Sequence, residues 1–248
     1  MPNLRTTSST ALRAGGGLRS APARARRHPR RDTHHARTLQ LLAGLLAVGS
    51  GIGMLIRADL GVASWDVLHV GLAGVTGWTV GTTAMVVGVG AAGLAALLGE
   101  RPRIGSLLPL AVIGPTIDVT MALLGPATDA VGQGALLTGG VLTLAIGVGA
   151  YVTSDHGAGP SDLVFLAVAR HGLPIWAARL LVDGTAVVAG ALIGGPVGIG
   201  TVVVTLALGP LVGLSIRVFD LAPAREVVVR RHAASDRALG DELAWEMA

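Results

Sequence analysis

Six apolar stretches, each about the length needed to cross a lipid bilayer, dominate this sequence. A transmembrane helix takes about 20 mostly apolar residues. Only 14% of the residues are charged and the mean hydropathy is +0.65, whereas about a quarter of residues are charged in soluble domains. The chain is therefore predicted to be an all-α polytopic membrane protein. The stretches are Leu39–Ile56, Thr79–Leu98, Ile104–Leu124, Gly134–Val152, Ile175–Ile193 and Ile199–Phe219.

The charges are concentrated outside these stretches. Residues 1–37 hold nine Arg and one Asp, whereas residues 38–219 hold only 14 charges. We expect residues 1–37 to be a basic, disordered cytoplasmic tail that keeps the first span positive-side-in, with a transit peptide or a start codon annotated too far upstream as alternatives. Residues 220–248 are predicted to form a second cytoplasmic tail. Because the basicity belongs to the first tail, no nucleic-acid partner is predicted.

Two further apolar segments, Trp65–Val75 and Ser161–Arg170, are only about ten residues long. Each follows a Gly-rich acidic loop. Their length predicts half-helices that enter the membrane without crossing it.

The loops before these two segments match each other. Asp59, Gly61 and Asp66 recur 96 positions later as Asp155, Gly157 and Asp162. After a one-residue gap the offset becomes 95, and the ordered matches continue. They are Gly77 with Gly172, Gly99 with Gly194, Ile104–Ser106 with Ile199–Thr201, and Gly114–Pro115 with Gly209–Pro210. The chain is therefore predicted to contain two copies of one unit, residues 38–125 and 126–219.

Each predicted copy has three crossings and one half-helix. An odd number of crossings inverts the second copy relative to the first. Arg101 and Arg103 then lie on the cytoplasmic side, as the positive-inside rule requires, and only Arg57 is misplaced. If both short segments crossed instead, there would be eight spans and parallel repeats. We prefer six crossings, with both termini cytoplasmic and the protein in the bacterial cell membrane.

The half-helix starts are the first candidate site. Gly61 and Gly157 are predicted to form tight turns. Ser64 is predicted to be an N-cap and Pro160 a first helical residue.

Asp66 and Asp162 fall in the first helical turns, where a carboxylate caps free N–H groups and suits the helix dipole. The alternative is functional: the two half-helix ends would line a shared central cavity, and their N–H groups would meet an anionic or polar solute. Asp59 and Asp155 would then lie at its mouth. His69 shares a helix face with Asp66, with either a structural or a proton-transfer role.

Charges inside the spans are the second candidate set. Arg179 and Asp183 are four residues apart and can form an ion pair or line a pathway. Asp118 is a candidate proton or cation site. Pro115 and Pro210 are predicted to kink their helices, for packing or as hinges.

The loop motifs resemble a known family. The run from Leu60 to Leu72 is similar to the signature of YczE-type bacterial membrane proteins, which are related to the YitT group. Residues 157–162 and 194–201 are similar to the second-copy signature of that family. Ser64 departs from it, because the family usually has Pro there. The resemblance implies an integral membrane protein of the bacterial envelope, without a settled activity.

Two functions fit these observations. One is a transporter or channel for a small polar solute, with its site between the two repeats. The other is a non-transporting accessory or scaffold protein that assists another envelope or biosynthetic system. We expect no enzyme, since His-Glu-x-x-His, Walker A and Gly-x-Ser-x-Gly motifs are missing, and no cofactor or metal. The lipid bilayer is the predicted partner, and the oligomeric state is left open, a homo-oligomer included.

Overall fold

The computed structural model describes residues 32–100, 104–154 and 159–219. These residues form eight α-helices and no strand. The helices are α1 (Asp32–Ala58), α2 (Ser64–Thr76), α3 (Val80–Leu97), α4 (Ile104–Leu123), α5 (Ala130–Thr153), α6 (Pro160–Ala169), α7 (Ile175–Leu192) and α8 (Ile199–Phe219). The all-α prediction is confirmed, and all six long stretches and both short segments are helical.

Five helices in the described part of the chain, α1, α3, α5, α7 and α8, are long and apolar enough to cross a membrane. The described side chains of α4 form a shorter apolar stretch, Leu108–Leu123. α1 begins at Asp32, so the last six residues assigned to the basic tail are helical. The rest of that tail, and the tail predicted for residues 220–248, lie outside the described residues.

Large apolar side chains are exposed along the outside of these helices. Leu97, Leu192 and Val131 are at least 80% exposed. Exposed apolar surface on this scale is unusual for a water-soluble monomer. It is the surface that a lipid bilayer covers.

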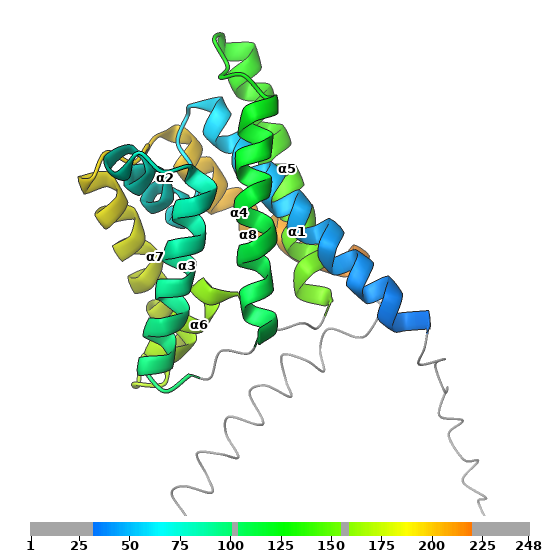
Figure 1. Cartoon of the computed structure of the whole chain (residues 1–248), viewed down its shortest axis with the longest axis vertical. Helices are drawn as coiled ribbons and strands as arrows, with labels where there is room; N and C mark the ends of the chain where they lie inside the picture. Colours follow the sequence, from blue (N-terminus) through cyan, green and yellow to red (C-terminus); the bar gives the residue numbers. More distant parts are fainter. Residues whose placement is uncertain (1–31, 101–103, 155–158, 220–248) are drawn as a thin grey trace, which may run out of the picture.

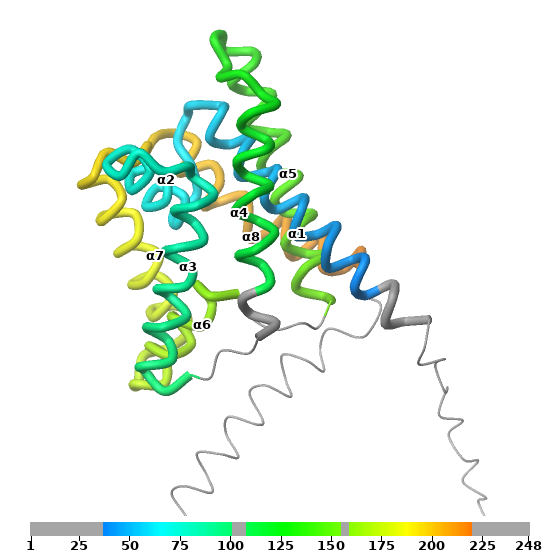
Figure 2. Tube along the Cα trace, in the orientation of Figure 1, coloured from blue at the N-terminus to red at the C-terminus, as the bar shows by residue number. Residues whose placement is uncertain are grey.

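The long helices alternate in direction (Figure 1). α1, α4 and α7 run upward in that view, and α3, α5 and α8 run downward. The two short helices lie at opposite ends of the molecule, α2 near the top and α6 near the bottom. The tube in Figure 2 shows that α1 and α5 cross the centre side by side and antiparallel.

Glycines bring α1 and α5 into backbone contact. A Cβ atom on Gly44 would lie 2.9 Å from the carbonyl oxygen of Gly147. A Cβ on Gly51 would lie at the same 2.9 Å from the oxygen of Gly140. Small residues at such positions allow close packing where the hydrophobic effect cannot drive helix association.

α4 packs on α1, and α8 packs on α5. On one side, a Cβ on Gly53 would lie 2.8 Å from the Cβ of Thr120. On the other side, a Cβ on Gly149 would lie 2.5 Å from the Cβ of Ser215. Each central helix therefore meets its neighbour through a glycine against a small hydroxyl residue.

The short helices pack on the long helices of the other half of the chain. α2 contacts α7, and α6 contacts α3. A Cβ on Gly190 of α7 would lie 2.5 Å from the Leu68 nitrogen. In the second interface, Ala95 and Ala167 are fully buried in one apolar cluster. These small residues hold each short helix close against its long partner.

Four glycines end helices or turns with positive φ. The φ angles are 73° at Gly77 and 96° at Gly172, and 93° at Gly99 and 89° at Gly194. These are the residues that the sequence matches paired. Residues with a Cβ rarely adopt this conformation, which explains why glycine occupies all four positions.

Candidate functional site

A cavity of about 640 Å³ lies between the helices. The first turns of both short helices line it, together with residues from α1, α3, α4, α5, α7 and α8. Its ionisable members are Asp66, His69, Asp162, Arg179 and Asp183, and Tyr151 also lines it. The structure thus brings five of the predicted pathway residues to one cavity, together with Ser64 and Pro160.

α2 begins with an unusual cap. The N-cap residue is Ala63, with φ −66° and ψ 160°, and no side chain caps the helix at this position. The predicted N-cap role of Ser64 is wrong, because Ser64 is the first helical residue. Its amide is one of the N–H groups that lack an intrahelical acceptor in any helix. Proline is favoured there for that reason.

α6 begins in the same way, with Gly159 as N-cap and Pro160 as the first helical residue. The prediction for Pro160 is confirmed. The Asp162 carboxylate accepts the Gly159 amide at 3.3 Å, as predicted for a first-turn acid. This bond satisfies one free N–H group and places a negative charge at the positive end of the helix dipole.

Asp66 occupies the equivalent position in α2 but contacts a different group. Its residue exposure is 5%, and its Oδ1 lies 3.3 Å from Nδ1 of His69. The two side chains share a helix face, as the three-residue spacing predicts. The main-chain carbonyl of His69 accepts the Thr83 hydroxyl at 2.9 Å, which ties α2 to α3.

Asp183 connects the two halves of the chain across the cavity. Its Oδ1 accepts the indole N–H of Trp65 at 3.0 Å, and its Oδ2 lies 3.4 Å from Nε of Arg179. The Arg179 guanidinium also stands 5.3 Å from the centre of the Phe165 ring. The predicted ion pair is therefore present, and aromatic residues of α2 and α6 flank it.

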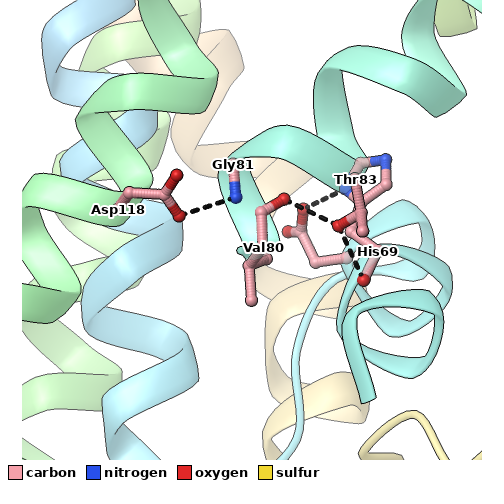
Figure 3. A network of polar contacts seen from close by, with 6 residues as sticks. His69, Val80, Gly81, Thr83 and Asp118 are labelled. Atoms are coloured by element: carbon pink, nitrogen blue, oxygen red, sulfur yellow. Dashed lines mark hydrogen bonds and ion pairs between the residues drawn. The ribbon is translucent and has the colours of Figure 1, made fainter. Parts of the chain in front are cut away.

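Asp118 does not line the cavity. Its carboxylate accepts the Thr79 hydroxyl at 2.6 Å and the Gly81 amide at 2.8 Å. Figure 3 shows Asp118 directed at the start of α3, with Thr83 and His69 beyond it. Asp118 therefore caps α3 from α4, where Gly81 is close enough for the two backbones to touch.

The other predicted site residues do not line the cavity or fall outside the described residues. Asp59 is exposed at the end of α1, with φ 53°, a conformation that Asp tolerates better than most residues. Pro115 and Pro210 lie inside α4 and α8 without ending them, next to the cavity-lining Gly114 and Gly209. Asp155 and Gly157 fall outside the described residues.

The tight turn predicted at Gly61 is confirmed. Its φ is 101°, and a Cβ there would lie 2.6 Å from the Gly198 nitrogen. In the same contact the Gly200 amide donates to the Leu60 carbonyl at 2.6 Å. The loop before α2 is thereby fixed to the start of α8.

Sequence reasoning missed three contacts. The first is the hydrogen bond from Trp65 to Asp183, and the second is the bond from Thr83 to the His69 carbonyl. Arg57 broke the positive-inside pattern, and the structure gives a reason: its Nε donates to the Met121 carbonyl at 2.9 Å. A cation at the carboxyl end of α4 suits the helix dipole. The misplaced charge alone could have indicated such a partner.

The geometry defines a class: an α-helical membrane protein with an internal cavity that contains ionisable side chains within apolar walls. The family profile described as "Family of unknown function (DUF6198)" matches residues 35–217, and the chain belongs to this family. No solved structure matches this chain.

Two bacterial proteins are similar to this chain over most of its length. The chain is 31% identical over 177 residues to "Uncharacterized membrane protein YczE" of Bacillus subtilis (strain 168), covering 70% of this chain and 82% of the relative. It is 28% identical over 184 residues to an "Uncharacterized protein" of Haemophilus influenzae, covering 74% and 84%. The resemblance to YczE-type proteins is confirmed, and the wider relation to the YitT group stays a prediction.

Proposed function

We propose that this protein is a transporter or channel for a small polar solute, which binds in the central cavity. The observation that carries the proposal is the lining of that cavity. It combines the first turns of two short helices with Asp66, Asp183 and Arg179, which come from both halves of the chain. Ionisable groups inside a membrane domain are costly and usually serve a pathway. The proposal assigns no catalytic reaction and no cofactor to the chain.

We further propose that the chain consists of two inverted repeats, α1–α4 and α5–α8. Three matched sets of packing pairs support this arrangement, whereas α3·α4 has no close counterpart in α7·α8. The pairs α1·α4, α2·α7 and α2·α3 have the counterparts α5·α8, α6·α3 and α6·α7. α1 and α5 are themselves counterparts, and they run antiparallel. An axis that relates two antiparallel helices lies in the membrane plane, which is the geometry of an inverted repeat.

The glycine contacts support the same arrangement. An offset of 96 turns Gly44 into Gly140 and Gly51 into Gly147, so the contact of Gly44 with Gly147 becomes that of Gly140 with Gly51. Likewise Gly53 against Thr120 corresponds to Gly149 against Ser215. The paired turn glycines all have positive φ angles, which also supports the repeat alignment.

This architecture has six crossings, with both termini on the cytoplasmic side of the bacterial cell membrane. Reporter tags at residues 101 and 130 test it. The tag at 101 should be cytoplasmic and the tag at 130 external. A tag at 101 on the external side would refute the inverted arrangement and favour eight crossings.

The absence of cysteine from the sequence allows a direct test of the transport proposal. In oriented vesicles, Ser64→Cys in the cavity should react with a water-soluble, membrane-impermeant thiol reagent added from at least one side. Leu206→Cys is the matched control. Leu206 is 71% exposed on the outer apolar surface of α8, and a cysteine there should not react because lipid covers it. An alternating or open pathway should make Ser64→Cys reactive from both sides.

A measurement of solute uptake completes the test. Proteoliposomes should take up at least one solute from a broad panel of amines, organic acids, amino acids and sugars, and the reagent bound to Ser64→Cys should block that uptake. An unreactive cavity cysteine together with no flux across the panel would refute transport and favour an accessory or scaffold role.

A further inference from the structure

We propose that the cavity binds a small organic cation, with the positive group held by Asp66. This inference rests on the proposed function and names the solute class for the same site. It differs from the expectation that the half-helix ends receive an anionic solute. Four features of the cavity support it.

The first feature is the charge of the lining. Asp66, Asp162 and Asp183 contribute three carboxylates, and Arg179 contributes one guanidinium. Leaving His69 aside, the described lining residues carry an excess of two negative charges. In a site with low-dielectric walls such an excess attracts cations and repels anions.

The second feature is that carboxylates already stand beside the positive groups that would attract an anion. The positive end of α6 is compensated by Asp162, which accepts the Gly159 amide. Arg179 is paired with Asp183 and stands over Phe165. At the start of α2, the buried Asp66 carboxylate places a negative charge within the first turn. An anion that approached either helix end would therefore meet a carboxylate.

The third feature is an open acceptor on Asp66. Its Oδ1 faces His69, and among the described residues no donor reaches its Oδ2. Among the described residues, every fully buried side-chain oxygen or nitrogen has a hydrogen-bond partner, so an oxygen without a partner is not fully buried. Oδ2 therefore opens on the cavity, although the side chain as a whole is only 6% exposed. A carboxylate oxygen in that position is suited to an ammonium group.

The fourth feature separates an organic cation from a metal ion. Within the described residues, no three His, Asp or Glu side chains converge closely enough to hold a metal. The rest of the cavity wall is largely apolar, with Trp65 and Tyr151 among its members. Apolar and aromatic surfaces favour the alkyl groups and the diffuse charge of an organic cation.

Binding of three matched probes to the purified full-length protein in nanodiscs tests the proposal. Choline, its neutral isostere 3,3-dimethylbutan-1-ol and the anion 3,3-dimethylbutanoate have similar shapes and differ mainly in charge; butylammonium serves as a primary amine. Calorimetry should detect binding of at least one of the two cations and of neither the alcohol nor the anion. Asp66→Asn should weaken cation binding roughly tenfold to a hundredfold, the range for losing a hydrogen bond to a charged group.

Asp129→Asn is the control, because Asp129 caps α5 on the surface, away from the cavity, and Asn is an equally good cap. It should leave cation binding unchanged. Should Asp66→Asn not fold, the probe series on the unmodified protein still decides the question. Preferential binding of the anion or the alcohol, no binding of either cation, or full binding by a folded Asp66→Asn variant would overturn the inference.

The two proposals fail separately. Cation binding together with no flux and an unreactive Ser64→Cys would refute transport and keep the cation site. Flux of an anionic or neutral solute, with no cation binding, would keep transport and refute the cation site.

Discussion

The first turns of α2 and α6 share their backbone geometry but use their carboxylates differently. Both N-cap residues are extended, and in both helices an aspartate is the third helical residue. Asp162 bonds to the Gly159 amide of its own helix start, whereas Asp66 faces His69. Under the proposed repeat alignment, the counterpart of His69 is Phe165, which lies beneath Arg179.

The same division holds around the whole cavity. Features of the backbone recur in both halves, including the positive-φ glycines and the close glycine contacts. Three charged side chains do not recur under the proposed alignment: Arg179 and Asp183 align with Ala84 and Gly88 of the first half, and Asp118 aligns with Gly213 of the second. If the two halves are repeats as proposed, their backbones are alike, and the unlike side chains give the cavity between them its chemistry.

The largest effect is expected where α2 rests on α7. Gly190→Leu should destabilise the protein by about 1–3 kcal/mol, the usual cost of overpacking, because its Cβ would lie 2.5 Å from the Leu68 nitrogen. Thermal unfolding in detergent measures this. Gly184→Leu on the same helix is the control, since nothing lies within 4 Å of a Cβ there. Equal stability of the two variants would mean that α2 does not pack on α7 as described.

Trp65→Phe tests the link that α2 has and α6 lacks. The substitution keeps an aromatic ring but removes the donor to Asp183, so we expect a loss of about 1.5 kcal/mol, as for hydrogen bonds to charged groups. Trp176→Phe, at a 70% exposed position, should be neutral. In a double-mutant cycle with Asp183→Ala the two effects should not add, and additivity would exclude the bond.

Substitutions of Asp118 distinguish a helix-capping role from a role as a proton site. Asp118→Ala should cost about 1 kcal/mol, as removal of an N-cap does, since Thr79 and Gly81 lose their acceptor. Asp118→Asn keeps an acceptor oxygen and should cost less. If flux is found, Asp118→Asn should retain most of it. Complete loss of flux in a stable Asp118→Asn variant would show that its charge is needed for function.

The smallest effect concerns the first helical residues. Ser64→Pro should make α2 begin as α6 does and stabilise the protein by about 0.4–1 kcal/mol through the unfolded chain. Pro160→Ser should destabilise it by a similar amount. Thermal unfolding of both variants checks the pair. A destabilising Ser64→Pro would mean that the Ser64 hydroxyl or amide has a role that Pro cannot supply.

Much of the fold could be predicted because its signals are local. Span length and apolarity gave all six long helices, and the Gly-rich loops indicated where α2 and α6 begin. The error at Ser64 is also local in origin: Ser is a good N-cap in general, but the helix begins one residue earlier. Arg57 and Asp118 were harder, because each caps a helix other than its own.

The sequence by itself determined that the chain is an α-helical membrane protein, where its short helices start and which charges lie within the apolar core. The tertiary structure decided which side chains distant in the sequence meet those charges. Trp65 and Asp183 are 118 positions apart and become neighbours only because glycines let α2 approach α7. Hydropathy and spacing act along the chain, whereas a cavity forms between helices from packing distances that no single segment contains.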